Sequence, residues 1–201
     1  MLIKAIFYGR GGQGAKSSAD IFAKSAIYQD YYGQSFSKFG AEKSGTPVYS
    51  FLRISDKEIR THEPFEKADI LVILDDTLLV FNPDIVDFID NTSKIKMIMI
   101  NCDNPKIIER VKQSLNEKKI NANIFRVDAT GIAIKHIGRN VPNTSLLAKL
   151  YKLLEEQGYD FNLNKLKQVV QELFEHKGKD IVEKNIQAID FAYNCKTKDE
   201  A

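Results

Sequence analysis

The sequence predicts an α/β fold: a three-layer, Rossmann-like, mostly parallel sheet with helices on both faces and a helical C-terminal segment. Three observations predict it. An apolar run at residues 2–8 leads through a glycine-rich turn into residues 13–29, where apolar side chains recur with helical spacing. Short apolar runs typical of buried parallel strands then alternate with helical segments as far as Val127. After Val127 we find only helical periodicity.

The elements follow in order from these patterns. Beyond the first strand and helix, further strands are expected at residues 33–39, 48–54, 68–74, 95–100 and 122–127, with a short returning strand at 58–61. Residues 78–90 have a mixed pattern, within which a helix is expected with Pro83 in its first turn. Further helices are expected at residues 105–118, 129–137, 145–157, 161–174 and 181–193. Asp128 is placed to cap the helix at 129–137, and Gly138 to end it.

This arrangement predicts one domain over residues 1–195, since 201 residues suffice for a single α/β core. Its sheet part is expected at 1–140 and its helical part at 141–195, with a frayed tail at 196–201.

Composition excludes several classes of protein. Hydrophobic residues make up 43% and charged residues 28%, as in ordinary globular proteins, and the net charge of +2 is spread without a basic face, which disfavours nucleic-acid binding. No apolar run approaches a membrane span, and the first residues already form a core strand rather than a signal peptide, so a cytoplasmic location is expected. Cys102 and Cys195 lie far apart and outside any CxxC motif, so we expect no metal or cluster held by this chain alone.

The turn after the first strand is the most informative local feature, and it reads Gly9-Arg10-Gly11-Gly12-Gln13-Gly14. Its first, third and sixth residues fit the G-x-G-x-x-G pattern, and free amides at the start of the next helix favour a pyrophosphate or carboxylate. A dinucleotide site also expects an acidic residue at the end of the second strand, and residues 33–39 contain none, which argues against ordinary NAD binding. Two alternatives stay open: a tight turn that only packs helix on strand, or a turn that receives an anion or a partner surface.

Other candidate positions each have a structural alternative. Asp75 and Asp76 follow a predicted strand, where they would face a ligand or hold a metal, or cap the next helix. Asn143 and Thr144, after Pro142, are a natural helix cap or an amide aimed at a ligand. Arg10 would meet an anion in bidentate fashion or pair with a neighbouring subunit. The three histidines are isolated, and no catalytic grouping can be assembled, so no catalytic residue is predicted.

Several segments together resemble one family. The GRGGQG run at residues 9–14 resembles the signature of the gamma subunit of 2-oxoacid:ferredoxin oxidoreductases. Five further stretches resemble that family's motifs in the same order: FGAEKSGTPV at 39–48, RISDKEI at 53–59, ADILV and DDTLL within 68–79, VDAT at 127–130 and VPNT at 141–144. The match covers residues 3 to 150 and is most similar to the pyruvate members, although Ala41 and Ser44 stand where the family usually has proline and arginine.

The resemblance implies a role in a multi-subunit enzyme. Alpha and beta partners would hold thiamine pyrophosphate, iron–sulfur clusters would pass electrons to ferredoxin with a ferredoxin-like delta subunit present, and coenzyme A would take the acyl group. This chain has no GDG start of a thiamine-pyrophosphate motif, so it is expected to be inactive alone, to organise the complex and to serve the coenzyme A side. The residues implied at a cofactor or interface site are Gly9, Arg10, Gly11, Gly12, Gln13, Gly14, Glu42, Lys43, Asn143 and Thr144. The alternative is a free-standing Rossmann-like nucleotide-binding redox or regulatory module.

Overall fold

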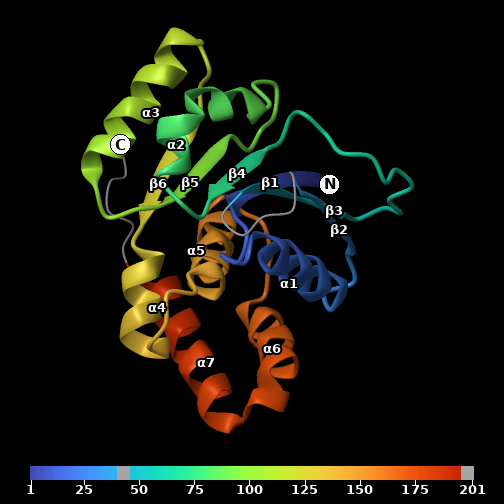
Figure 1. Ribbon diagram of the computed structural model, residues 1–201. Helices are drawn as coiled ribbons and strands as arrows, with labels where there is room; N and C mark the ends of the chain where they lie inside the picture. Colours follow the sequence, from blue (N-terminus) through green and yellow to red (C-terminus); the bar gives the residue numbers. More distant parts are fainter. Residues whose placement is uncertain (40–45, 196–201) are drawn as a thin grey trace.

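A six-stranded sheet forms the centre of the molecule in the computed structural model, which describes residues 1–39 and 46–195 (Figure 1). The strand order is β2-β3-β1-β4-β5-β6. The strands are β1 (Leu2–Arg10), β2 (Tyr32–Phe39), β3 (Pro47–Ser55), β4 (Ile70–Ile73), β5 (Met97–Asn101) and β6 (Asn123–Val127). The neighbours β1, β4, β5 and β6 run parallel, whereas β3 is antiparallel to both β1 and β2. The predicted mostly parallel sheet is therefore confirmed, with an antiparallel pair added at one edge.

Helices cover both faces of this sheet, which confirms the three-layer architecture. On one side of the sheet lie α1 (Ala15–Ile27), α4 (Ala129–Ile137) and α5 (Asn143–Glu156). The helices α6 (Leu163–Phe174) and α7 (Lys179–Asn194), joined by the short 3₁₀ turn η2 (Glu175–Lys177), pack on these helices and share their core. The other face packs against α2 (Leu78–Phe81), the 3₁₀ segment η1 (Pro83–Phe88) and α3 (Pro105–Glu117). In Figure 1, α6 and α7 form a hairpin that extends from α1 and α5 away from the sheet.

Side chains that alternate along the strands give each helical layer an apolar face of the sheet to pack against. On β3, Leu52 and Ile54 join the core beneath α1 and α5, whereas Phe51 joins the core beneath α2 and α3. The central strands β4 and β5 are buried on both faces, as their continuous apolar sequences predict. Tyr151 of α5 is fully buried, with its ring centroid 4.8 Å from that of Phe22 of α1. The helical C-terminal part thus shares its core with the sheet.

The structure differs from the sequence prediction in two segments. The returning strand expected at residues 58–61 is wrong, because this segment is irregular. The guanidinium of Arg53 instead secures the segment that follows, donating to the Glu63 carbonyl at 2.6 Å and lying 4.8 Å from the centre of the Phe65 ring. The helix expected within 78–90, with Pro83 in its first turn, is the 3₁₀ segment η1, and the short helix α2 precedes it; Asn82, with a φ of −135° immediately before Pro83, separates the two.

Both ends of α4 were predicted from neighbouring residues in the sequence. Asp128 accepts a hydrogen bond from the Gly131 amide at 2.7 Å and caps α4, and Gly138 ends that helix with a left-handed φ of 80°. Both predictions are confirmed. Among the helices of the described residues, none combines the length and apolar character that crossing a bilayer requires.

Candidate functional site

Three glycines of the turn between β1 and α1 have separate steric reasons. A Cβ on Gly9 would lie 3.3 Å from the Leu74 Cβ, so glycine at this position lets the end of β1 pack closely against the residue that follows β4. Gly12 has a φ of 93° and open space around it, so it allows close approach from outside. Gly14, with a φ of 89°, is the N-cap of α1, and a Cβ there would lie 3.1 Å from Asn143. The turn therefore combines tight packing with one accessible position whose backbone conformation favours glycine.

Some backbone N–H groups of this turn donate hydrogen bonds to other described residues, and others do not. Gly11 N–H donates to the Thr46 carbonyl, and Gln13 N–H donates to the Arg10 carbonyl, both at 3.0 Å. The N–H groups of Gly12 and of residues 14–17 have no acceptor in the part of the chain that the structure describes. Because the N-cap is a glycine with no side-chain cap and the first turn of α1 contains no acidic residue, this helix end favours an anion.

Asp75, directly after β4, holds the turn in shape. Its Oδ2 accepts from Arg10 Nε at 3.1 Å and from Gln13 Nε2 at 2.7 Å, and its Oδ1 accepts from the Thr77 amide at 3.0 Å. Gln13 Oε1 accepts in turn from the Arg10 amide at 2.7 Å, and Arg10 Nη2 donates to Thr77 Oγ1 at 2.9 Å. Arg10 is thus paired within the chain. Burial alone would raise the pKa of Asp75, but the hydrogen bonds from Thr77 and Gln13 and the charge of Arg10 outweigh it and lower that pKa.

A second helix begins beside the first. The N-cap of α5 is Pro142 without a side-chain cap, so the predicted cap by Asn143 or Thr144 is wrong. Thr144 is 1% exposed and donates to Asn185 Oδ1 at 3.3 Å, which turns its side chain into the core. Asn143 lies against Gly14, so the uncapped N-termini of α1 and α5 are neighbours.

These two helix starts border a basic cavity of about 470 Å³. Arg139, Lys177 and Lys184 line it together with Gly12 and residues of α7, and Asp180 is the acidic residue among its lining. Lys184 is paired with Asp180 at 2.7 Å. Sequence reasoning missed all three cations. Arg139 could have been selected because it lies just before the VPNT stretch at 141–144. No local sequence pattern marks the two lysines, because only the packing of α7 brings them to this cavity.

An acidic cavity of about 350 Å³ lies on the other side of the same turn. It opens at the carboxyl ends of β4, β5 and β6 and contains Asp75, Asp76, Asp103 and Asp128. Burial, with the charge of Asp75 added, raises the pKa of Asp76. This cavity repels a pyrophosphate, although it lies at the carboxyl ends of the strands, where open α/β sheets bind ligands. Within residues 1–39 and 46–195, no group of three or more His, Cys, Asp or Glu side chains is placed to bind a metal ion.

The remaining predicted site residues, Glu42 and Lys43, lie in the 40–45 segment, outside the described residues, as do the departures Ala41 and Ser44. The structure therefore brings together residues 9–14 with Asn143, turns Thr144 inward, and adds three cations that the sequence analysis did not select.

Comparison with known proteins decides the family. The model of the pyruvate ferredoxin/flavodoxin oxidoreductase family matches residues 4–195. The chain belongs to this family. The gamma-subunit resemblance drawn from the six motifs is thereby confirmed.

Its relatives are similar over nearly the whole chain. The common subunit gamma of pyruvate/ketoisovalerate oxidoreductases from Thermococcus kodakarensis is 34% identical over 196 residues, which is 96% of each chain. Pyruvate synthase subunit PorC from Methanothermobacter marburgensis is 33% identical over 192 residues, again 96% of each chain.

Solved structures share the fold. The crystal structure of the pyruvate oxidoreductase subunit PORC from Thermotoga maritima superposes with a TM-score of 0.78 at 27% identity and covers 98% of this chain and 97% of its own. A 2-oxoglutarate:ferredoxin oxidoreductase from Magnetococcus marinus, with 2-oxoglutarate, coenzyme A and succinyl-CoA bound, has a TM-score of 0.71 at 18% identity over 95% of this chain and 30% of that one, a likeness of fold alone.

Proposed function

We infer that this chain is the gamma subunit of a multi-subunit 2-oxoacid:ferredoxin oxidoreductase of the pyruvate synthase type, and we propose that it serves the coenzyme A side of the reaction. The complex decarboxylates a 2-oxoacid oxidatively to acyl-CoA and CO₂ and delivers electrons to ferredoxin. In this proposal the alpha and beta subunits hold thiamine pyrophosphate, iron–sulfur clusters lie in partner subunits including a ferredoxin-like delta subunit, and the site of action is cytoplasmic. The chain's own residues do not resemble a site for either group: it lacks a GDG motif, and Cys102 and Cys195 are free and far apart in sequence.

One observation carries the coenzyme A proposal: two uncapped helix N-termini meet at a basic cavity. Coenzyme A bears a pyrophosphate and a further phosphate on its ribose, so its nucleotide end is strongly anionic. Open amides of Gly12 and Gly14 would meet one phosphate, while Arg139 and Lys177 would offset the remaining charge, since Lys184 is paired with Asp180. A cavity of about 470 Å³ falls in the range of small-molecule sites.

The residues of the turn then have distinct roles. Gly9 and Gly11 let the turn lie close to β4 and the Thr46 carbonyl, and Arg10 and Gln13 hold its shape through Asp75. The remaining predicted residues would act around them: Asn143 at the rim beside Gly14, Thr144 by anchoring the start of α5, and Glu42 and Lys43 from the adjoining segment. Holding the nucleotide end here leaves the thiol end free to extend toward partner subunits, which fits a chain that binds and orients rather than reacts.

The test is a matched pair of glycine variants in the assembled enzyme. Gly12→Ala puts a methyl group into the open turn at a φ of 93°, whereas Gly158→Ala places the same strain, at a φ of 83° with nothing nearby, at the far end of α5. Each should cost about 1 kcal/mol of stability, but only Gly12→Ala should raise the KM for coenzyme A, by about tenfold. Arg139→Glu should raise it as well. Equal KM values in all variants would refute the coenzyme A role, and a loss of assembly in Gly12→Ala alone would favour a partner surface at the turn.

The alternative, a free-standing nucleotide-binding redox module, has less support because β2 carries no acidic residue for a ribose hydroxyl and because an acidic cavity adjoins the glycine turn. Calorimetry of the purified chain with NAD, NADP and FAD separates the two. We expect no heat with any of them, and tight binding of one would favour the module.

A further inference from the structure

The loop between α4 and α5 separates the basic cavity from the acidic cavity, and its residues alternate between the two. Arg139, Val141 and Asn143 line the basic cavity, whereas Asn140 and Pro142 line the acidic cavity. A contact that fixes this loop from the acidic side therefore also sets the position of Arg139 on the basic side.

The position of Arg139 depends on its backbone. Its side chain is exposed and has no hydrogen bond or ion pair among the described residues. The Val141 amide donates to the Arg139 carbonyl at 3.0 Å, which is a bond within the loop itself. In the described part of the chain, residues 139–141 are joined to other elements by one hydrogen bond, from Thr130 Oγ1 to Asn140 Oδ1 at 3.4 Å.

The hydroxyl group of Thr130 is oriented by Asn101, which is buried at the end of β5. Asn101 Nδ2 donates to the Leu74 carbonyl at 2.8 Å and to Thr130 Oγ1 at 2.9 Å, and Asn101 Oδ1 accepts from the Thr130 amide at 3.1 Å. Both ends of the Asn101 amide are therefore engaged, which fixes its orientation. Because Thr130 Oγ1 already accepts a hydrogen bond, its single hydrogen is left to point to Asn140.

These hydrogen bonds also connect the loop to the glycine turn. Leu74 directly precedes Asp75, which holds the turn in shape, and a Cβ on Gly9 would lie 3.3 Å from the Leu74 Cβ. The path from Leu74 through Asn101 and Thr130 thus relates the turn to the loop that carries Arg139.

We propose that Asn101 and Thr130 are positioning residues that hold Arg139 toward the phosphate site at the glycine turn. Both line the acidic cavity and not the basic one, so they act through Asn140 and the backbone of the loop. A guanidinium binds phosphate by two parallel hydrogen bonds in a fixed geometry, so a small displacement of the loop weakens binding. The inference rests on the proposed coenzyme A function.

The first test is a pair of threonine variants in the assembled enzyme. Thr130→Val keeps the shape of the side chain but removes the hydroxyl group, and it should raise the KM for coenzyme A about fivefold at unchanged kcat. Thr130→Ser keeps the hydroxyl group and should keep the wild-type KM. Thr92→Val is the matched control, because it removes a hydroxyl group that donates to Asp90 at 2.6 Å before the start of β5. An unchanged KM in Thr130→Val would overturn the proposal.

A second variant reaches the same contact from its other side. Asn140→Ala removes the acceptor at an exposed position, so it should raise the KM as Thr130→Val does even if Thr130→Val folds poorly. Hydrogen–deuterium exchange of residues 139–141 should be about fivefold faster in both variants than in Thr130→Ser. Equal exchange in all three would show that this hydrogen bond does not hold the loop.

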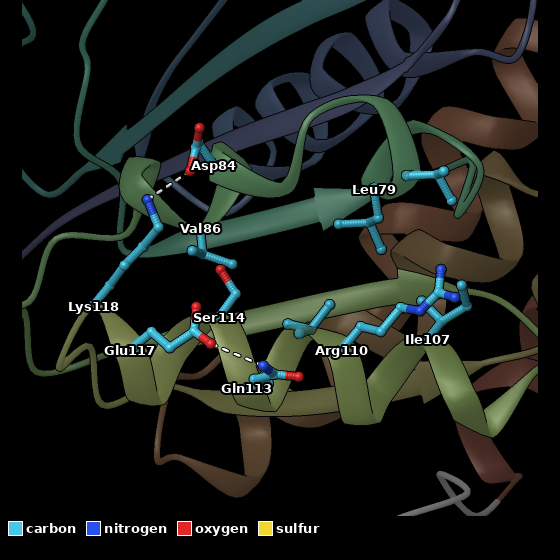
Figure 2. Close-up of a pocket in the computed structure, with 11 residues that line it drawn as sticks. Leu79, Asp84, Val86, Ile107, Arg110, Gln113, Ser114, Glu117 and Lys118 are labelled. Carbon is cyan, nitrogen blue, oxygen red and sulfur yellow. Dashed lines mark hydrogen bonds and ion pairs between the residues drawn. The ribbon is translucent and has the colours of Figure 1, made fainter.

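A double-mutant cycle tests whether Thr130 acts through Arg139. In an Arg139→Ala background, Thr130→Val should have no further effect on the KM, because the guanidinium that it positions is gone. The control background is Arg110→Ala. Figure 2 shows Arg110 in the groove between α2 and α3, on the opposite face of the sheet, and in this background the fivefold increase should persist.

The outcomes separate this inference from the coenzyme A function. If Arg139→Ala raises the KM and the effect of Thr130→Val adds to it in full, the positioning role is wrong and the coenzyme A function stands. An unchanged KM in Arg139→Ala would also overturn the positioning role. Only if Gly12→Ala leaves the KM unchanged as well does the coenzyme A function fail with it.

Discussion

Asp75 is the residue on which the shape of the glycine turn depends, and its replacement by asparagine tests this directly. The substitution keeps the size of the side chain but replaces one carboxylate oxygen by an NH₂ group. In the native protein Oδ2 accepts from Arg10 Nε and Gln13 Nε2, and Oδ1 accepts from the Thr77 amide. An asparagine can accept on one side only, so it loses either the Arg10 and Gln13 bonds or the Thr77 bond.

The expected loss follows from these contacts. Hydrogen bonds to a charged group contribute about 1.5–3 kcal/mol each, and the partial exposure of the pair, 28% for Arg10 and 13% for Asp75, screens part of this energy. We expect Asp75→Asn to lower the free energy of unfolding by about 2–3 kcal/mol. For a domain of this size that corresponds to a decrease in Tm of about 4–12 °C. Differential scanning calorimetry at neutral pH measures it.

Asp76→Asn is the matched control, since the pKa of Asp76 is raised by burial and by the charge of Asp75. Removing its charge relieves repulsion, so Tm should stay the same or rise slightly. Equal decreases in Tm for Asp75→Asn and Asp76→Asn would refute the assignment of Asp75 as the anchor of the turn.

The pH dependence gives a further check on the same residue. Because the folded state lowers the pKa of Asp75, the stability it contributes is present above its unfolded pKa of about 3.9 and is lost as the pH falls through the lowered value. The difference in stability between the wild-type chain and Asp75→Asn should therefore be constant near neutrality and shrink in acid. A difference that grew as the pH fell would contradict the lowered pKa.

Two other predictions concern packing and reactivity. Gly33→Ala would place a Cβ 2.3 Å from the Ala23 carbonyl oxygen. It should therefore lower the free energy of unfolding in urea by about 3 kcal/mol, more than Gly158→Ala does. Equal losses for the two variants would show that α1 and β2 separate freely. Burial raises the pKa of Cys102 to about 12, so a thiol reagent at mildly alkaline pH should label Cys195 and leave Cys102 unmodified; rapid labelling of Cys195→Ser would contradict this.

The features that local chemistry determines could be predicted from the sequence. The apolar runs identified the buried strands, and Asp128 with Gly138 marked the ends of α4, because a cap needs only neighbouring residues. The glycine turn was predicted between β1 and α1, where the structure has it. Local pattern also placed Arg53 on β3, but it could not show that this side chain would secure the next segment in place of a strand.

The features that distant contacts determine could not be predicted. Lys177 and Lys184 reach the turn only because α6 and α7 fold back onto α1 and α5, a placement that no local pattern records. Thr144 appears as a capping residue in sequence, yet the packing of α7 turns it to Asn185. Arg10 appears free in sequence, and its pairing with Asp75 spans 65 positions.

Hydrogen–deuterium exchange of residues 11–18 in the assembled enzyme, with and without coenzyme A, tests the central claim most directly. The amides of Gly12 and of residues 14–17 have no acceptor within the described chain, so a bound phosphate should slow their exchange by about tenfold or more. If coenzyme A supports turnover while exchange in this segment stays the same, the turn does not bind it and the account is wrong.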